Sequence, residues 1–361
     1  MPKKKSSSIE RVPTPKHLAK LDREILALLN ERVEKAIARK AAKPEESDTL
    51  KDAREAIETL VAESKGPLGG EAVQAVFREL YSGQRAAAQK TRVAFLGPDF
   101  TFSHLAAIKH FGQSVEFVPV SSIAAVFESV ERGTAEYGLV PLENSTDGRV
   151  TDALDGLSKS TAKICGEVPL PIRHCLLGIG ARGDIRRVCS KPQALSQCRN
   201  WLSKHLPEAE VTPVASTAEA ARMAGADRTI AAVASAEAAA VHELKVIARS
   251  IQDQADNVTR FAVIGVSPGE KTGNDKTALV FEAPHEPGAL ADVMAIFKKQ
   301  RLNLTWIESF PIPGARGRYL FFLEFQGHPS ELRPRRALAS LEKKSLRLTV
   351  LGSYAQAELI D

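Results

Sequence analysis

The composition and hydrophobic pattern of the chain change near residue 91, and this change limits the possible folds more than any other feature. Residues 16–90 are rich in Ala, Leu, Glu, Lys and Arg, with breaks only around Lys43-Pro44 and at SKGPLGG. These residue types favour helices, so the sequence predicts three helices here. Short apolar runs such as RVAFLG and YGLVPL then alternate with alanine-rich stretches, which predicts α/β units around a mostly parallel sheet.

A third pattern begins after the polar stretch SPGEKTGNDK. From Thr277 onward, strand-like and helix-like segments follow the order βαββαβ. At the other end, three lysines precede a run of serines, which is typical of a solvated tail without fixed structure. The sequence therefore predicts four segments, which are a basic disordered tail over residues 1–15, a helical domain over 16–90, an α/β domain over 91–268 and an α+β domain over 277–361.

Composition narrows the class of protein. The 361 residues are 43% hydrophobic and 26% charged, with a formal net charge of +5, which is ordinary for a soluble chain with more than one core. No hydrophobic stretch is long enough for a bilayer, and the N-terminus lacks the apolar core of a signal peptide, so we expect a cytoplasmic location. The four cysteines form no CxxC pair, which argues against a zinc site or disulfide framework and fits a reducing compartment. They are Cys165, Cys175, Cys189 and Cys198.

The stretch NVTRFAVIG, residues 257–265, begins like a turn and ends like a buried strand. The apolar run that starts at Phe261 is typical of a strand in a covered sheet, so its first end can face a crevice. Thr259 and Arg260 would then place a hydroxyl donor and a fixed cation beside that crevice. A strand-edge hydroxyl and a solvated arginine are the structural alternative.

Polar groups also gather where other predicted strands end. In FLGPDFTFSH a strand ends at Gly97 and a helix starts near Ser103, so backbone amides and a helix N-terminus would face an anion there. Ser103 can also be the cap of that helix. Loops at the carboxyl ends of parallel strands are where ligands bind in such sheets. Further candidates of this kind are Asn144, Ser145 and Thr146 after the strand in VPLENSTDG, and Ser216 and Thr217 at the helix start in ASTAEAA.

These motifs together resemble prephenate dehydratase. VAFLGPDFTFSH, YGLVPLENSTDGRV, KPQALSQC, ASTAEAA, AAVASAEAA and NVTRFAVIG occur in the order and approximate spacing of that family. The resemblance implies a two-lobed, periplasmic-binding-protein-like α/β domain that makes phenylpyruvate, with Thr259 assisting the departing hydroxyl and with no metal or other cofactor. Lys191 stands where the family commonly has histidine. The implied substrate-binding residues are Arg260, Phe261, Asn144, Ser145, Thr146, Ser103, Ser216, Thr217 and Gln193.

Cations continue the apolar face of the first predicted helix. Helical periodicity places Leu21, Ile25 and Leu28 on one face, which then carries Arg32, Arg39 and Lys43. Either the helix emerges into solvent there, or the bundle encloses an anion pocket. The region resembles the all-helical chorismate mutase family, whose three helices form an intertwined dimer. The implied chorismate-binding residues are Arg32, Lys43, Arg54 and Gln84.

Two departures from the mutase pattern concern the reaction itself. The family's early arginine would fall near Pro15, and Ala88 stands where a glutamine or glutamate is usual. The rearrangement needs donors on both sides of the breaking ether bond, and Ala88 cannot supply one. Gln84, one turn earlier on the same face, can substitute in part. We therefore expect a slow mutase.

The last segment resembles the ACT regulatory domain. EPGALADVMAIFKKQRLNLTWIESFPIP predicts a strand end, a glycine turn, a helix and a second strand. The resemblance implies phenylalanine binding between subunits, with feedback on the dehydratase, although Gly288 is also suited to an ordinary helix start. Phe310 replaces the family's usual arginine and would retune the response. The implied effector-site residues are Gly288, Ala289, Leu290, Glu308 and Ser309.

Three classes of function remain at this point. The polar loops and the Thr259-Arg260 pair favour a dehydratase, with arogenate as the alternative substrate to prephenate. A two-lobed unit with a cleft also describes a non-catalytic amino-acid sensor. A nucleic-acid-associated protein has only the basic tail in its favour. We expect small-molecule partners, no nucleic acid or membrane partner, and a homodimer or homotetramer.

Overall fold

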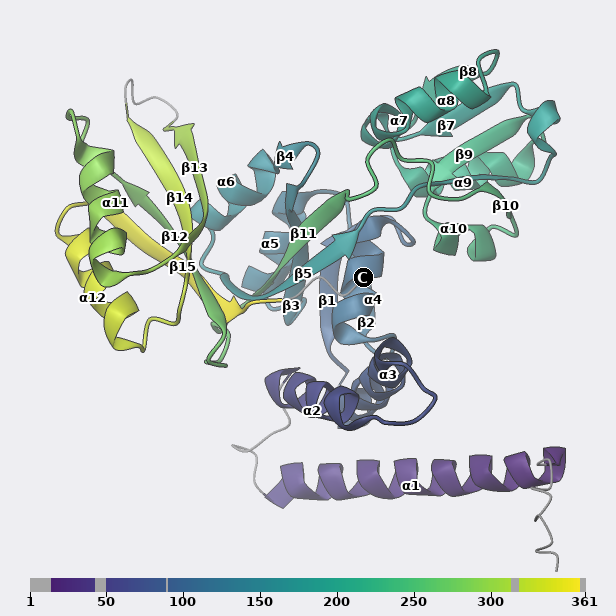
Figure 1. Cartoon of the computed structure of the whole chain (residues 1–361), viewed down its shortest axis with the longest axis horizontal. Helices are drawn as coiled ribbons and strands as arrows, with labels where there is room; N and C mark the ends of the chain where they lie inside the picture. Colours follow the sequence, from purple (N-terminus) through teal and green to yellow (C-terminus); the bar gives the residue numbers. More distant parts are fainter. Residues whose placement is uncertain (1–13, 43–49, 89, 313–317, 358–361) are drawn as a thin grey trace, which may run out of the picture. The chain divides into compact units, whose positions relative to one another are not determined.

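The computed structural model describes residues 14–42, 50–88, 90–312 and 318–357. The chain divides into two compact units, Met1–Gln89 and Lys90–Asp361, which are coloured along the sequence in Figure 1. The first unit contains the three helices that the sequence predicts. They are α1 (Pro15–Ala42), α2 (Leu50–Glu63) and α3 (Gly70–Ala88).

Helices α2 and α3 share a small core, whereas α1 leaves its apolar face exposed. Ala53 and Ile57 of α2 pack with Tyr81 of α3. Among the described residues of α1 none is buried. Leu21 and Ile25 are 41% and 53% exposed, so the face predicted from periodicity has no core to enter within one chain. An apolar stripe on a 28-residue helix is unfavourable in water and is normally covered.

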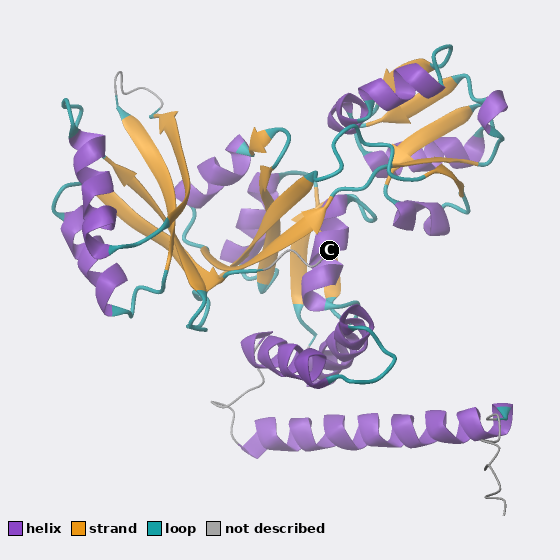
Figure 2. Cartoon of the chain, in the orientation of Figure 1, coloured by secondary structure: helices purple, strands orange, loops and turns teal. Residues whose placement is uncertain are grey.

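Two sheets form the second unit, as the strands in Figure 2 show. Within the described residues the larger sheet has ten strands in the order β13-β14-β12-β15-β5-β11-β3-β1-β2, with β4 paired to β3, and the smaller has the order β10-β6-β9-β7-β8. The predicted α/β and βαββαβ regions are both present, but the expectation of a mostly parallel sheet is wrong. Both sheets are mixed, because β11 runs antiparallel to β3 and β5, and β6 runs antiparallel to β9 and β10. The strands of the larger sheet that precede the C-terminal region are β1 (Arg92–Leu96), β2 (Glu116–Val120), β3 (Tyr137–Asn144), β4 (Gly148–Arg149), β5 (Lys163–Pro171) and β11 (Val258–Gly265).

The first lobe is built on these strands. β1 pairs in parallel with β2 and β3, whereas β11 lies antiparallel between β3 and β5. The residues of β11 from Phe261 to Gly265 are all buried, as the apolar run predicts, so side chains on both faces of this strand are covered. The helices of this lobe are α4 (Phe102–Phe111), α5 (Ile123–Glu131) and α6 (Thr151–Lys159).

The second lobe is inserted between β5 and β11, so the chain passes from one lobe to the other twice. Its alanine-rich helices bury small side chains such as Ala220 and Ala224 against β9, which lets helix and sheet approach closely. Its strands are β6 (Cys175–Gly178), β7 (Arg187–Ser190), β8 (Glu210–Pro213), β9 (Ile230–Ala234) and β10 (Lys245–Ala248), and its helices are η2 (Arg182–Asp184), α7 (Pro192–Gln197), α8 (Arg199–His205), α9 (Thr217–Ala226) and α10 (Ala236–Val241).

The C-terminal region adds its four strands to the edge of the first lobe. Phe297 and Leu323 belong to a core that two helices and the sheet share. β15 meets β5 at Gly352, where a Cβ atom would lie 2.1 Å from the Ile164 carbonyl oxygen, so only glycine permits this approach. The elements are β12 (Asp275–Glu282), α11 (Ala289–Gln300), β13 (Leu304–Pro311), β14 (Tyr319–Gln326), α12 (Leu332–Glu342) and β15 (Arg347–Ala355). No helix in the described ranges is both long and apolar enough to cross a membrane.

Candidate active site

A cleft of about 530 Å³ is lined by residues of both lobes of the second unit. This volume suits a small organic ligand, since such sites are typically 300–1,000 Å³. The lining includes the carboxyl ends of β1 and β3 and the first end of β11, as the sequence predicts for a ligand crevice. The sequence-predicted residues that line it are Ser103, Asn144, Gln193, Ser216, Thr217, Thr259 and Phe261.

Thr259 and Asn144 are register partners on adjacent strands and form a hydrogen-bonded pair at the cleft. The Asn144 side-chain oxygen accepts the backbone N–H groups of Thr146 and Asp147, at 2.9 and 3.0 Å, so its amide nitrogen must be the donor. That nitrogen donates to the Thr259 hydroxyl oxygen over 2.8 Å. A threonine hydroxyl that accepts in this way keeps its own proton for another acceptor. Asn144 therefore prepares Thr259 to donate to a ligand.

A chain of amide side chains extends this pair to the second lobe. Asn144 also donates to Asn257 at 2.8 Å, and Asn257 donates to the Gln197 side-chain oxygen at 3.0 Å. The same oxygen lies 2.9 Å from His174 Nε2, so that nitrogen carries the proton and Nδ1 is left as an acceptor. Burial lowers the pKa of His174 and outweighs the hydrogen bond to Gln197, which acts in the opposite direction. The lowered pKa favours the neutral ring. Gln197, Asn257 and His174 were not predicted as site residues.

Five helices begin at the cleft. The starts of α4, α5, α6, α7 and α9 all contribute lining residues. Ser216 caps α9 by accepting the Glu219 N–H at 3.0 Å, as predicted, but the cap of α4 is Thr101 and not Ser103. Helix N-termini carry partial positive charge, and Lys191 is the one Lys or Arg among the described lining residues. The cleft therefore favours an anionic ligand.

Arg260 lies on the opposite face of β11 from the cleft and is not among the described lining residues. Successive side chains of a strand point to opposite faces, so a residue next to Thr259 turns away from it. The guanidinium is instead 2.7 Å from Glu324 and 3.2 Å from Glu167, and only 15% of the side chain is exposed. This position disagrees with the expectation that Arg260 holds a substrate carboxylate.

Ser145 and Thr146 also fall outside the described lining. The Ser145 hydroxyl accepts the Val258 N–H at 2.9 Å, which joins the end of β3 to the start of β11. Thr146 donates its backbone N–H to Asn144 and places its hydroxyl 3.3 Å from Gln254. Both residues shape the turn that supports Asn144, which differs from the direct ligand contact that was expected. Turn-forming and ligand-binding hydroxyls have the same sequence pattern after a strand.

The predicted mutase residues are partly brought together within the first unit. The Arg32 guanidinium donates to the Gln84 side-chain oxygen and lies 4.3 Å from the centroid of the Tyr81 ring. Arg54 of α2 pairs with Glu58 of the same helix at 3.4 Å. Lys43 lies outside the described residues. Arg32 and Gln84 thus share a polar cluster between α1 and α3.

The predicted effector residues lie on two elements of the C-terminal domain. Gly288 is the N-cap of α11 with φ of +86°, followed by Ala289 and Leu290. A Cβ at Gly288 would meet nothing within 4 Å, so its left-handed backbone, and not a close approach within this chain, requires glycine. Glu308 and Ser309 lie on the edge strand β13, where the Glu308 carboxylate accepts from Arg149 at 2.6 Å.

The fold and cleft define a class of protein, which is a two-lobed α/β protein with a cleft suited to a small anion, a helical N-terminal unit and a C-terminal βαββαβ domain. Residues 93–268 match the family described as prephenate dehydratase. A bifunctional chorismate mutase/prephenate dehydratase of Aquifex aeolicus is 41% identical over 354 residues, which cover 95% of this chain and 97% of that protein. The chain belongs to the bifunctional chorismate mutase/prephenate dehydratase family.

Two further relatives bear on substrate and regulation. Prephenate dehydratase from Arthrobacter aurescens, solved in complex with L-Phe, is 34% identical with a TM-score of 0.69, covering 74% of this chain and 90% of that one. Arogenate dehydratase/prephenate dehydratase 2 of Arabidopsis thaliana is 37% identical, covering 73% of each chain. In the described ranges, no group of three or more His, Cys, Asp or Glu side chains is placed to hold a metal ion.

Proposed function

We infer that this chain is a prephenate dehydratase with a chorismate mutase region, as family membership over 95% of its length implies. The position of the Thr259 hydroxyl is the observation that links the dehydratase reaction to particular residues. This hydroxyl lies in a cleft lined by helix N-termini, and its oxygen accepts a hydrogen bond from the Asn144 side-chain amide over 2.8 Å. A hydroxyl so oriented can donate to a leaving oxygen.

The proposed reaction turns prephenate into phenylpyruvate, carbon dioxide and water. The bond between the ring and its carboxylate breaks, releasing carbon dioxide, and its electron pair enters the ring. The bond from the ring to its hydroxyl breaks at the same time, and the departing hydroxide takes up one proton from solvent to become water. Thr259 donates a hydrogen bond to that departing oxygen, where negative charge develops. A threonine hydroxyl is a weak acid, so its contribution comes from position. The two carboxylates are held by Lys191 and by the amides at the helix starts.

Prephenate is the proposed substrate, and arogenate is the alternative because an Arabidopsis relative carries both names. Arogenate has an ammonium group where prephenate has a keto group. The starts of five helices and Lys191 disfavour an added cation, although Asp152 in the first turn of α6 also lines the cleft.

Steady-state kinetics with each substrate should therefore give the higher kcat/KM for prephenate, by about tenfold or more. Asp152→Asn should leave prephenate turnover nearly unchanged and lower the residual arogenate turnover. A higher kcat/KM for arogenate would reverse the assignment of the substrate.

Phenylalanine is the proposed effector, since the Arthrobacter relative was solved with L-Phe. Binding near Gly288 and Ser309 should lower dehydratase turnover by favouring one arrangement of the lobes. Gly288→Ala should weaken binding at least tenfold, because alanine at a φ of +86° is strained. Calorimetry measures this directly. Gly273→Ala is the matched control, with φ of +95° and equally open surroundings. The absence of any phenylalanine binding up to millimolar concentration in the unmodified chain would contradict the proposal.

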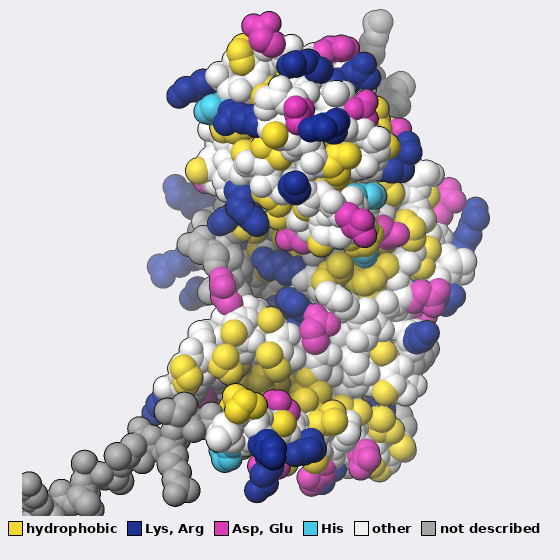
Figure 3. All heavy atoms as spheres, turned by 90° about the vertical axis from the view of Figure 1, so that its right-hand side faces the viewer, with side chains coloured by type: hydrophobic (Ala, Val, Ile, Leu, Met, Phe, Trp, Pro, Cys, Tyr) yellow, Lys and Arg dark blue, Asp and Glu magenta, His cyan; other side chains and the backbone are white. Residues whose placement is uncertain are grey.

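We also propose a homodimer or homotetramer in the cytoplasm. The exposed apolar face of α1 and the edge strand β13 are surfaces that a second copy of the chain can cover. The four cysteines are free thiols, as in a reducing compartment. Figure 3 shows a face on which Lys and Arg side chains are interspersed with Asp and Glu, which gives nucleic acid no uniformly basic surface among the described residues there.

A further inference from the structure

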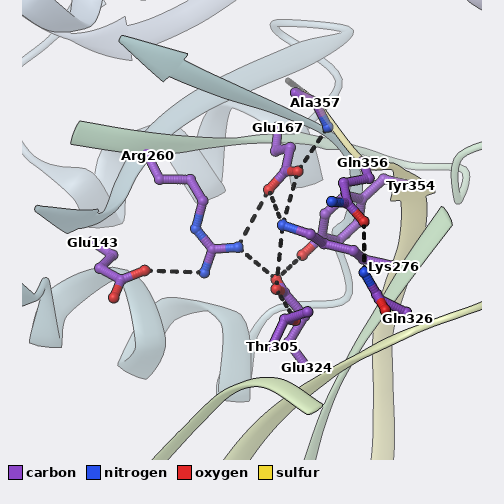
Figure 4. Close-up of polar contacts among 10 residues, drawn as sticks. All are labelled: Glu143, Glu167, Arg260, Lys276, Thr305, Glu324, Gln326, Tyr354, Gln356 and Ala357. Carbon is purple, nitrogen blue, oxygen red and sulfur yellow. Dashed lines mark hydrogen bonds and ion pairs between the residues drawn. The ribbon is translucent and has the colours of Figure 1, made fainter. Parts of the chain in front are cut away.

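Arg260 occupies the centre of a buried charge cluster behind the proposed catalytic strand (Figure 4). Its guanidinium contacts three carboxylates, Glu324 at 2.7 Å, Glu167 at 3.2 Å and Glu143 at 3.3 Å. It also lies 4.9 Å from the centroid of the Trp306 ring. A buried arginine held by several partners has little freedom, so its backbone on β11 is tied to all of them.

The Glu324 carboxylate has hydrogen-bond and ion-pair partners on several neighbouring strands. Besides Arg260, its carboxylate accepts from Thr305 at 2.5 Å and from the Tyr354 hydroxyl, and Lys276 lies 3.5 Å away. Burial raises the pKa of Glu324, but Arg260 and Lys276 outweigh this and hold the pKa below its usual value. The carboxylate is therefore charged at neutral pH. Loss of that charge would leave buried cations undercompensated.

The cluster joins the dehydratase region to the C-terminal domain. Glu143, Glu167 and Arg260 belong to residues 93–268, which match the dehydratase family. Glu324 and Trp306 belong to β14 and β13 of the C-terminal domain. Within the described residues, Arg260 is the cation that the dehydratase region contributes to this cluster, and it contacts both domains. A shift of β14 therefore acts on β11 through Arg260.

Arg260 and Glu143 lie on β11 and β3, and these two strands also carry the proposed catalytic pair. In the register of β11 and β3, Thr259 is opposite Asn144 and Arg260 is opposite Glu143. Thr259 and Asn144 line the cleft, whereas Arg260 and Glu143 form an ion pair at 3.3 Å on the other face. Both members of the catalytic pair are thus one residue from a member of the charge cluster. A rotation of the strands at the cluster would therefore change the geometry between Thr259 and Asn144.

We propose that Arg260 is a positioning residue that, through Glu324, couples the C-terminal domain to the Thr259–Asn144 pair. It acts on turnover through the backbone of β11 and does not bind the substrate. The proposal rests on the dehydratase function inferred above. Phenylalanine binding to the C-terminal domain would act on the cleft by this route.

Glu324→Gln tests the route with little change of shape. It should lower kcat for prephenate about tenfold and leave KM within about twofold, because residues along a coupled network change turnover by such amounts without touching substrate. The inhibition by phenylalanine should be largely lost. Glu282→Gln is the matched control, since Glu282 is a buried, ion-paired carboxylate of the same domain whose partner is Arg318. Equal effects of the two substitutions on kcat and on inhibition would overturn the proposal.

Two more variants separate positioning from other roles. In a Thr259→Ala background, Glu324→Gln should cause almost no further loss of kcat, because its effect passes through the missing hydroxyl. Fully additive losses would overturn the coupling. Arg260→Lys should reduce kcat with KM nearly unchanged, and a raised KM with unchanged kcat would instead make Arg260 a substrate-binding residue. Wild-type turnover is measured first, since absence of phenylpyruvate there refutes the dehydratase function itself and not this route.

Discussion

Thr259→Ala should lower kcat for phenylpyruvate formation on the order of 10²-fold or more while the protein stays folded. The loss follows from removing the hydroxyl that is proposed to donate to the leaving oxygen and that Asn144 holds at 2.8 Å. The fold should persist because Asn144 keeps its bond to Asn257 and the strand hydrogen bonds do not involve the side chain. Steady-state kinetics and a thermal melt measure the two effects separately.

Thr259→Ser is the control for this substitution. Serine keeps the hydroxyl but loses the methyl group that restricts the rotamer, so we expect partial activity, between that of the wild type and that of Thr259→Ala. If Thr259→Ala turned over prephenate at a near-normal rate, Thr259 would have no role in the chemistry. The cleft would then have to supply another donor.

The mutase reaction of the unmodified chain should be slow, and Ala88→Gln should accelerate it by about 10²-fold. As the carbon–oxygen bond of chorismate lengthens, the ether oxygen becomes more basic and needs a donor from each side. Ala88 is the last residue of α3 and offers none. Gln84, one turn earlier, shares a hydrogen bond with Arg32 and is the donor that remains on this helix face. Rates of chorismate loss measure the effect.

Gln84→Ala completes this comparison. It should reduce the slow reaction further, because it removes that remaining donor and a partner of Arg32. A wild-type rate typical of efficient enzymes, unaffected by Gln84→Ala, would show that the departures from the family pattern at Pro15 and Ala88 have no chemical consequence.

The predictable features of the fold are those set by local pattern. The apolar run after Thr259 predicts a buried strand, and the order of short runs and helices predicts both the α/β and the βαββαβ regions. The apolar face of α1 is predictable from its periodicity, but what covers it is not, because the face stays exposed within one chain.

The site was predictable where its residues lie at strand and helix ends. Gln197 and His174 were missed because their roles come from contacts across 60 and 23 residues of sequence, with Asn257 and with each other. The position of Arg260 could have been predicted from strand alternation, since neighbours on a strand face opposite ways. The motif resemblance led instead to a shared role for adjacent residues.

The dehydratase function is tested by incubating the purified 361-residue protein with prephenate and following phenylpyruvate and carbon dioxide. We expect one molecule of each per prephenate consumed, without any added cofactor, and much slower formation of both products in Thr259→Ala. Binding of prephenate or phenylalanine with no phenylpyruvate at any enzyme concentration would contradict this function, and would favour a non-catalytic sensor built on the same two-lobed fold.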